Sequence, residues 1–451
     1  TALAAVVLRR LQDGDDGGHI RRAAEQFVDP ALAERILDRY YIAGGKSDTV
    51  PYALHALYKM ANSKPLIDLT IFANFVEVWL AKEGHAGNVG VNFLEKIQLP
   101  HLPSIYGAML AGVDYVLMGA GIPLKIPGAL DRLAQHQRAE YPMDVSGAGR
   151  SEFAVAFEPS EYVFVPPAPL KRPRFLAIVA SNVLAEALAK KSTGHVDGFV
   201  VEHHSAGGHN APPRKKGETN TRGEPAYGER DAVDIERMRK LDRPFWMAGS
   251  YGHPEDLAQA LAQGAAGVQV GTAFAFCDES CFPEMIKRRV LAAVVDGSID
   301  LYTDGRASPT GFPFKVVQVE GTLSDEDLYA DRERNCDLGY LRTLYMKPDG
   351  SVGYRCPAEP TRQYVSKGGL IEDTPGRKCL CNALTATMGG GQVREGGASE
   401  VPIVTAGDDL KNLTPLVNLD TLSYSAYDVV NYLTKTIAVG ASRPLANIRT
   451  H

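Results

Sequence analysis

Residues 197–209 read Asp-Gly-Phe-Val-Val-Glu-His-His-Ser-Ala-Gly-Gly-His. Phe199–Val201 is a short apolar strand that runs into a turn of small residues and ends on His209. Gly207 and Gly208 have no Cβ, so the backbone there bends sharply and lets a flat or charged ligand approach closely. A histidine titrates near neutral pH and can give or take a proton. The stretch therefore predicts a strand end at which a cofactor site and a proton-transfer group meet.

The segments on either side of this stretch repeat an alternation of short apolar strands and helices. Helices are expected over Phe72–Glu83, Val183–Lys190 and Pro254–Gln263. Such an alternation predicts parallel strands joined by right-handed crossovers. Eight units fit a (β/α)8 TIM barrel, with a doubly wound open sheet as the alternative. The eight strands are expected at Leu66–Leu69, Asn88–Asn92, Tyr115–Met118, Phe153–Phe157, Phe175–Ala180, Gly198–Glu202, Phe245–Ala248 and Gly267–Val270.

The pattern also predicts the domain organisation of this α/β protein. Residues 1–63 are expected to form a helical N-terminal extension, and residues 64–320 the barrel. Residues 321–451 mix short strands, glycine clusters and cysteines, which indicates a smaller C-terminal domain or cap. Within the barrel, residues 158–172 form an expected insertion with an edge strand. The polar residues 210–230 follow the glycine turn directly and are expected to form a loop over the site.

Composition and charge exclude several classes of protein. The chain has 451 residues, 45% of them hydrophobic and 23% charged, which is ordinary for a globular protein. A net charge of −6 argues against a nucleic-acid or anionic-membrane partner. No apolar run reaches the ~18 residues that span a bilayer, and the N-terminal apolar run is too short for a secretion signal. Six cysteines make no disulfide scaffold, so we expect a cytoplasmic protein, and a homodimer by default.

A second glycine-rich pattern follows the last two expected strands. Ala248-Gly249-Ser250 ends one strand and Gly271-Thr272 ends the other. In a barrel these are strands seven and eight, where backbone N–H groups at glycine turns commonly bind a phosphate group. Small residues let the amides reach the phosphate oxygens, and Thr272 adds a hydroxyl. The alternative is that both are ordinary turns that use glycine for geometry alone.

Four motifs together resemble a known family. They are Gly-Val-Asn at 90–92, Ser-Ala-Gly-Gly-His at 205–209, Ala-Gly-Ser at 248–250 and Gly-Val-Gln-Val-Gly-Thr at 267–272. In this order they resemble the nitronate monooxygenase family, formerly called 2-nitropropane dioxygenases. The same pattern covers the flavin-dependent enoyl-ACP reductases. The resemblance spans about residues 65–315 and implies a (β/α)8 barrel that binds FMN non-covalently at the carboxyl ends of its strands.

The resemblance also implies roles for individual residues. His209 would be the active-site histidine that acts as a base or polariser beside the flavin. Asp197 matches an acidic position at the opening of a family strand, and a strand-end hydrogen bonder is the alternative for it. The residues implied to bind the cofactor are Asn92, Ser181, Gly207, Gly208, Ala248, Gly249, Ser250, Gly271 and Thr272.

The chain departs from the family pattern at several positions. The usual opening of the first strand, Ala-Pro-Met or similar, is absent at residues 68–71. Ser205 stands where an acid is usual, Asn210 stands where a glycine is frequent, and His203 and His204 are additional. We therefore expect a substrate pocket that differs from that of a standard nitronate enzyme.

Histidines and cysteines raise the alternative of a metal site. His203, His204 and His209 lie within seven residues, but neighbouring residues on an extended segment point to opposite faces, which argues against joint ligation. Four thiolates in the C-terminal region, with Cys277 and Cys281 as additional ligands, are able to bind zinc or an iron–sulfur cluster. Their spacing lacks a repeated Cys-x2-Cys pattern, so buried small hydrophobic side chains are the favoured interpretation. These four are Cys336, Cys356, Cys379 and Cys381.

A basic cluster, Arg214, Lys215 and Lys216, follows the glycine turn. On a loop over the site it would bind a carboxylate, a phosphate or the phosphopantetheine end of an acyl carrier protein. A solvated charged loop is the simpler alternative.

Taken together, the sequence predicts an FMN-dependent oxidoreductase of nitronate monooxygenase type. It would oxidise a nitronate or a similar carbon acid with oxygen, with His209 transferring the proton. One alternative is an enoyl-thioester reductase that uses NAD(P)H and acts on a carrier-bound acyl chain. A second alternative is a barrel without flavin that binds a phosphorylated metabolite.

Overall fold

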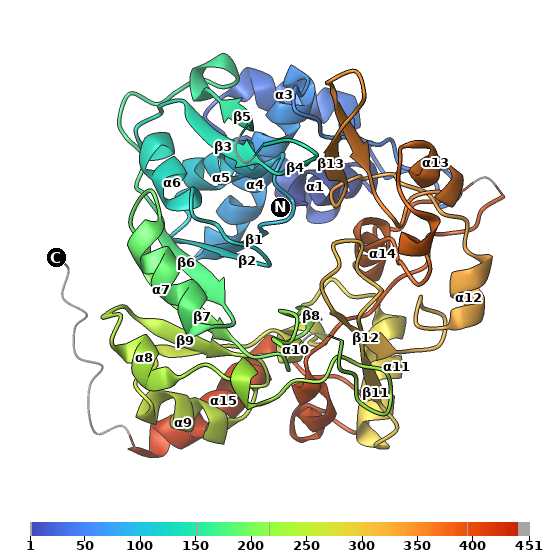
Figure 1. The fold of residues 1–451 in the computed structure, drawn as a ribbon. Helices are drawn as coiled ribbons and strands as arrows, with labels where there is room; N and C mark the ends of the chain where they lie inside the picture. The colour runs from blue at the N-terminus through green and yellow to red at the C-terminus, as the bar shows by residue number, and fades with distance from the viewer. Residues whose placement is uncertain (1, 150–151, 216, 395, 441–451) are drawn as a thin grey trace.

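A six-stranded parallel sheet forms the centre of the protein in the computed structural model, which describes residues 2–149, 152–215, 217–394 and 396–440. The strand order is β1-β2-β6-β7-β9-β10, and Figure 1 shows these strands crossing the middle of the molecule. Six of the eight expected strands are thereby confirmed in their expected order. Their bounds are β1 (Gly90–Leu94), β2 (Tyr115–Gly119), β6 (Arg174–Val179), β7 (Gly198–Glu202), β9 (Phe245–Ala248) and β10 (Gly267–Gln269).

The other two expected strands are not part of this sheet. Leu66–Leu69 lies inside the helix α4 (Lys64–Lys82), which has a proline in its first turn and buries most of its length against α1 and α5. Phe153–Phe157 is the strand β5, but it pairs antiparallel with β3 (Ala139–Met143). In the described residues β1 and β10 pair only with β2 and β9, so the sheet is a parallel half-barrel, and the closed eight-stranded barrel that we expected is not formed there.

Side chains on the sheet alternate between two apolar layers, as the two-residue period of a strand requires. Phe175, Ala177 and Val179 of β6 belong to the main hydrophobic core, which the helices cover. Leu176 and Ile178 of the same strand face the inside of the half-barrel, where they pack in a second, smaller cluster with Val200 and Ala248. Both faces of the sheet are therefore buried, and the strand ends are left as the place for polar side chains.

Helices surround the sheet, and all three expected helices are confirmed. Two of them are α7 and α9, and the third, Phe72–Glu83, is the second half of α4. The N-terminal extension is helical only to Tyr40; residues 41–63 are irregular, contrary to our expectation, because the backbone of Tyr52 bonds to the side chain of Gln392 instead of to its own turn. The helices are α1 (Leu3–Gln12), α2 (His19–Ala24), α3 (Pro30–Tyr40), α5 (His101–Leu110), α6 (Ile126–Ala134), α7 (Asn182–Lys191), α8 (Ile235–Arg239), α9 (Pro254–Ala262), α10 (Thr272–Ala275) and α11 (Glu284–Val295).

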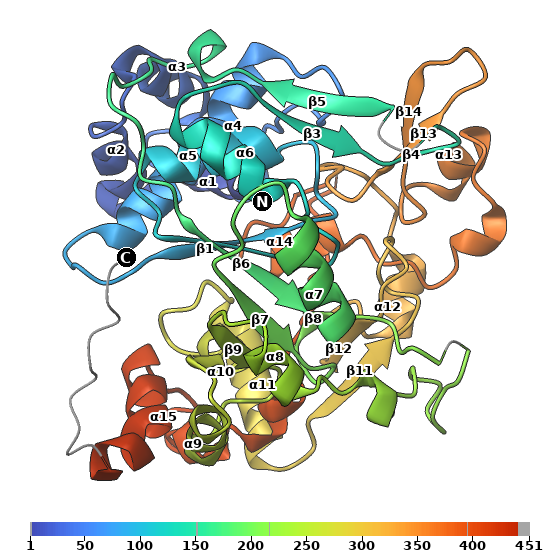
Figure 2. The same cartoon turned by 60° about the vertical axis from the view of Figure 1, so that its left-hand side comes forward.

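The C-terminal region wraps around the other elements and does not lie apart from them. Figure 2 shows α15 beside α9 and α12 beside the strands β11 and β12. Leu380 and Ala383 of α14 pack with Ala5 of α1. The strands β11 (Asp300–Asp304) and β12 (Phe314–Gln318) come just before the C-terminal region. Its helices and longer strands are α12 (Glu326–Asp331), β13 (Thr343–Met346), β14 (Val352–Arg355), α13 (Thr361–Ser366), α14 (Leu380–Thr387) and α15 (Ala426–Gly440). Two very short strands, β4 (Val145–Ser146) and β8 (Gly208–His209), pair with β13 and β12.

Apolar contacts cross both expected domain boundaries. One cluster joins Ala5 and Tyr58 of the N-terminal extension with Leu338, Leu380 and Ile403 of the C-terminal region. The division at residues 63/64 and 320/321 stays a prediction. In the described part of the chain, no helix is both long and apolar enough to cross a membrane.

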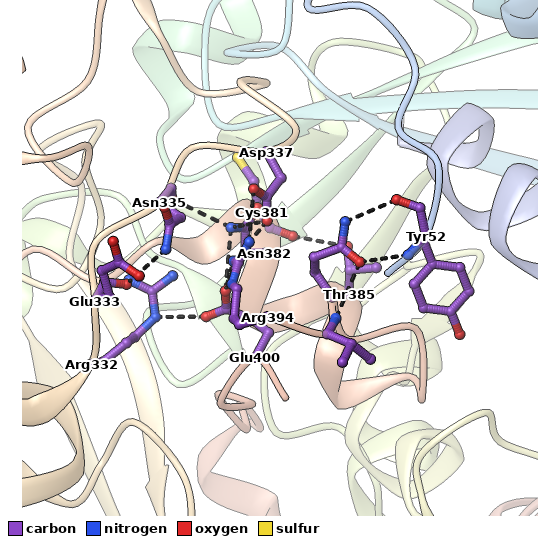
Figure 3. Close-up of polar contacts among 12 residues, drawn as sticks. Tyr52, Arg332, Glu333, Asn335, Asp337, Cys381, Asn382, Thr385, Arg394 and Glu400 are labelled. Carbon is purple, nitrogen blue, oxygen red and sulfur yellow. Dashed lines mark hydrogen bonds and ion pairs between the residues drawn. The ribbon is translucent and has the colours of Figure 1, made fainter. Parts of the chain in front are cut away.

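A buried ionic network, drawn in Figure 3, holds the C-terminal region together. The carboxylate of Glu400, of which 2% is exposed, accepts hydrogen bonds from Arg332 Nε at 2.6 Å and from an Arg394 guanidinium nitrogen at 2.5 Å. Arg394 also donates to both carboxylate oxygens of Asp337, at 3.0 and 2.8 Å. Asn382 at the start of α14 donates to Asp337. Each charge in the network has an opposite partner, which is the condition for burying it.

Candidate functional site

Two adjoining cavities open at the carboxyl ends of the parallel strands, where α/β proteins place their sites. We call the first the glycine cavity; it has a volume of about 290 Å³. The second, the histidine cavity, has a volume of about 260 Å³ and contains His209. The two share Asn92 in the middle of β1, Glu202 at the end of β7, and Gly207. Eight of the nine expected cofactor residues line the glycine cavity: Asn92, Gly207, Gly208, Ala248, Gly249, Ser250, Gly271 and Thr272.

Backbone donors without partners line the glycine cavity. Gly249 and Ser250 turn away from β9 with φ of 91° and 59°. In the described part of the chain, no acceptor bonds the N–H groups of Gly249, Ser250 or Gly271. A Cβ on Gly271 would meet nothing within 4 Å, so the backbone there faces open space. Unpaired amides at a helix start attract an anion, so this cavity fits the phosphate of FMN.

A C-terminal segment, Val404–Asp409, forms the remaining wall of the glycine cavity. Thr405 Oγ1 accepts a hydrogen bond from Gly208 N at 2.7 Å, and Thr272 Oγ1 accepts one from Gly407 N at 2.9 Å. The segment therefore links the two glycine turns. The sequence reasoning missed it, because its contacts with Gly208 and Thr272 join residues far apart in the chain.

The C-terminal segment explains why residue 207 is a glycine. A Cβ on Gly207 would lie 2.7 Å from the backbone of Ala406, so the missing side chain lets the C-terminal segment approach. Gly208 differs: its φ is 76° and a Cβ would meet nothing within 4 Å, so its backbone borders the open cavity. Of the two glycines, Gly208 is therefore the one with free space for a ligand.

Asp409 brings a carboxyl group into the glycine cavity. Burial raises its pKa, and one of its oxygens, Oδ1, has no hydrogen-bond partner in the described part of the chain. Because burial favours the neutral form, the carboxyl is compatible with an anion in the same cavity.

His209 lies in the histidine cavity and is held from two directions. Its Nε2 lies 2.6 Å from Ser308 Oγ, and its ring packs edge-on against Phe314 with centroids 5.0 Å apart. Burial lowers its pKa to about 4. At neutral pH the imidazole is therefore uncharged, so that it accepts or shares a proton but does not begin as a cation.

A third cavity, which we call the lid cavity, lies under the 210–230 loop and has a volume of about 220 Å³. Ser181 lines this cavity and not the glycine cavity, and its hydroxyl caps α7 by accepting from Leu184 N. The rings of His204 and Tyr227 stack there with centroids 4.0 Å apart. Arg214 lines it too, whereas Lys215 pairs with Glu218 and Lys216 lies outside the described residues.

Glu202 is a functional candidate that the sequence reasoning did not single out. It borders all three cavities. Burial raises the pKa of its carboxyl group to about 7. The signal was present in the opening stretch, because a carboxylic acid directly follows a strand that is apolar on both faces.

The expected opposite orientation of His203 and His204 is wrong. Their rings lie against each other with centroids 3.9 Å apart, because β7 ends at Glu202 and the chain has already left the strand. His203 Nδ1 lies 2.8 Å from the hydroxyl of Ser205, at the position where the family has an acid. Burial lowers the pKa of both histidines, that of His204 to about 4.

The four C-terminal cysteines do gather in one place. Cys356, Cys379 and Cys381 pack together around Ala358. Burial raises the pKa of the Cys379 thiol to about 12 and that of Cys356 further. No group of three or more His, Cys, Asp or Glu side chains in the described residues lies in an arrangement that holds a metal ion. Cys281 is exposed beside Arg10, away from this group.

Asp197 lies at the opposite end of the sheet from the cavities. Its Oδ2 accepts from Phe175 N and from Arg172, both at 2.8 Å. These contacts agree with the interpretation of Asp197 as a hydrogen-bonding residue at a strand end.

Comparisons with known proteins follow the same motifs. Residues 165–306 match the family model described as nitronate monooxygenase, which confirms the resemblance across this segment. Two curated relatives are named (3aS,4S,5R,7aS)-5-hydroxy-7a-methyl-1-oxo-octahydro-1H-indene-4-carboxyl-CoA dehydrogenase. The relative from Mycobacterium tuberculosis is 28% identical over 145 residues, 32% of this chain and 36% of that protein. The relative from Rhodococcus jostii is 31% identical over 131 residues, 29% of this chain and 33% of that protein.

The chain thus spans about a third of the length of the curated relatives it matches. Among solved structures, FabK from Thermotoga maritima is similar with a TM-score of 0.45 and 15% identity, over 82% of this chain and 83% of that chain. The matched family and both curated relatives are named as oxidoreductases.

Proposed function

We propose that this protein is an FMN-dependent oxidoreductase of the nitronate monooxygenase type. The observation that carries the proposal is the glycine cavity, where unpaired amides of Gly249, Ser250 and Gly271 lie beside the cavity that holds His209. The amides would hold the phosphate of FMN, and Asn92 and Gly208 would border its ring system. When bound, FMN supplies a site that takes up and releases electron pairs.

The residues of the chain position the substrate and its proton. Ser308 orients the ring of His209, and burial keeps that ring uncharged at neutral pH. A neutral imidazole at this place accepts a hydrogen bond or transfers a proton beside the cofactor. The loop over the lid cavity, with Pro212 and Tyr227 in its wall, limits access of water from that side.

Two substrate classes fit this site. The first is a nitronate or a similar carbon acid, with oxygen as the electron acceptor. The second is an acyl thioester, with NAD(P)H as the electron donor when the reaction is a reduction. The names of the curated relatives, which are carboxyl-CoA dehydrogenases, favour the second class.

Arg214 supports the thioester class. It lines the lid cavity, and no ion pair engages its guanidinium in the described part of the chain. A free guanidinium binds the phosphate groups of coenzyme A or of a carrier-bound phosphopantetheine.

Isolation of the protein tests the proposal directly. The protein should be yellow, and FMN should be released when it is denatured. His209→Ala should retain the flavin and lose most of its turnover. A colourless protein that does not take up FMN would contradict the proposal and would support the alternative, a barrel that binds a phosphorylated metabolite. Anaerobic titration with NADH and NADPH, followed by oxygen, then separates a reductase from an oxidase or monooxygenase.

A further inference from the structure

Glu202 is the point at which the three cavities meet. In the described part of the chain, it is the one side chain common to the glycine, histidine and lid cavities. It is the last residue of β7, a central strand of the sheet, so its backbone is fixed by neighbouring strands on both sides. A rigid strand end is a precise place for a reacting group.

The carboxyl group of Glu202 has no protein partner. In the described residues neither of its oxygens has a hydrogen bond or an ion pair. Buried carboxyl groups are almost always paired, because an unpaired charge away from water is costly. Glu202 is half-buried, and its unpaired carboxyl group borders three cavities, which is the position of a group that meets a ligand.

The surrounding charges do not explain its titration. Burial is the one cause that raises the pKa of Glu202 to about 7, so both of its forms are present at neutral pH. An acid–base group works best when its pKa is near the working pH, whereas the pKa of His209 lies near 4. The titratable and charged groups that face Glu202 across the cavities are His203, His204, His209, Arg214, Asp231 and Asp409, with Tyr227 in the lid cavity as well.

We propose that Glu202 exchanges a proton with a carbon atom of the substrate, which lies in the lid cavity while the cofactor lies in the glycine cavity. The inference rests on the proposed function and adds the substrate class, a neutral carbon acid. A carboxylate oxygen takes the proton from a C–H bond next to a nitro group or a thioester carbonyl. The O–H bond forms as the C–H bond breaks, and the electron pair stays on the substrate, delocalised onto the nitro or carbonyl oxygen. A preformed nitronate needs no such base.

The titration of Glu202 is measured first, on flavin-free protein, by infrared spectroscopy of protonated carboxyl groups. Wild-type protein should show one carboxyl group that protonates near neutral pH. Glu202→Gln should lack that band, whereas Asp409→Asn, which changes the other buried carboxyl of the glycine cavity, should retain it. A band that persists in Glu202→Gln, or that disappears in Asp409→Asn instead, overturns the proposal. Because no flavin is present, this result does not depend on the proposed function.

Proton exchange is measured second, on the flavin-loaded protein without oxygen. The probes are nitroethane and S-butyryl-pantetheine in D2O, followed by NMR of the hydrogens next to the nitro group or the carbonyl. Wild-type protein should speed the exchange of one probe, and Glu202→Gln should lose about 100-fold or more of that rate while its flavin spectrum is unchanged. Glu236→Gln, which changes an exposed carboxyl group that lines none of the three cavities, should keep most of it. Equal rates in wild type and Glu202→Gln, or no exchange of either probe by the wild type, would contradict the proposal.

Discussion

The Nε2 atom of His209 lies 2.6 Å from the Oγ atom of Ser308, a residue 99 positions later in the chain. This bond and the edge contact with Phe314 fix the ring toward the histidine cavity. Ser308→Ala should leave the FMN content unchanged and lower turnover by about 2- to 10-fold, the effect of one lost hydrogen bond. Flavin absorbance and steady-state rates measure the two quantities. Thr310→Val, which changes the other neighbour of Ser308, is the control and should be close to wild type. Loss of flavin from Ser308→Ala would contradict a purely orienting role.

Gly271 tests the phosphate position. Its backbone faces open space in the glycine cavity, so a side chain there would fold without a clash but would occupy the ligand's place. Gly271→Val should weaken FMN binding by about 10-fold or more, since one to three kcal/mol is the usual scale for a misplaced methylene. Gly228→Val is the matched control, because Gly228 also has free space within 4 Å and lines none of the three cavities. Equal flavin affinity in both variants would place the phosphate elsewhere.

The free energy of unfolding should fall as the pH drops from 6.5 to 4. Burial lowers the pKa of His101 to about 4, so below pH 6.5 the unfolded chain takes up a proton that the folded chain does not. Glu202 has the opposite sign: its pKa is near 7 in the folded state and near 4.5 when unfolded, so its ionisation destabilises the fold as pH rises through that window. His101→Gln should therefore flatten the acid loss and Glu202→Gln should steepen it. Urea unfolding at pH 4.5, 5.5 and 7 measures both slopes; parallel curves for all three proteins would refute the assignment.

The sequence predicted the strands of the sheet well where an apolar run ended in a glycine turn. β2 and β9 are examples, because four consecutive apolar residues followed by Gly fit a strand buried in the sheet. The run Leu66–Leu69 is apolar except for Asp68, but it lies in α4, because so short a run has no period and the buried face of α4 is nearly continuous. Only the length of the surrounding run, with Pro65 at its start, favoured a helix.

Of the candidate site, the part that lies in local motifs was predictable. The glycine turns and Asn92 are recognised by residue type and all border one cavity. Thr405 and Ser308 were not predictable, because they reach the site through tertiary contacts with Gly208 and His209 from far along the chain. No local pattern encodes such a contact.

The cysteines should behave as buried thiols. Burial raises the pKa of Cys379 to about 12, so its thiol stays protonated and unreactive, whereas Cys281 is exposed. Iodoacetamide should label Cys281 first in the native protein, and the remaining cysteines only after unfolding. Elemental analysis should find well under one metal atom per chain. A stoichiometric amount of zinc or iron that protects Cys356 and Cys379 from labelling after mild denaturation would instead support a metal site.

Of the polar side chains in the C-terminal region, Glu400 should be the one whose removal lowers the free energy of unfolding most. Its carboxylate is almost fully buried and pairs with Arg332, of which 8% is exposed, and with Arg394. Glu400→Ala leaves the Arg332 charge buried without its partner, and such a loss costs about 3–5 kcal/mol. Arg394 is less affected, because its bonds to Asp337 remain (Figure 3). The exposed pair Arg239–Glu236 provides the control: Glu236→Ala should change the free energy of unfolding by less than about 1 kcal/mol. Urea unfolding of the two variants and of wild type measures the difference.

Because the C-terminal segment also carries Thr405 to Gly208, Glu400→Ala should weaken flavin binding together with stability, whereas Glu236→Ala should affect neither. A destabilised Glu400→Ala that binds FMN as tightly as wild type would show that the network stabilises the C-terminal region without supporting the cavity wall.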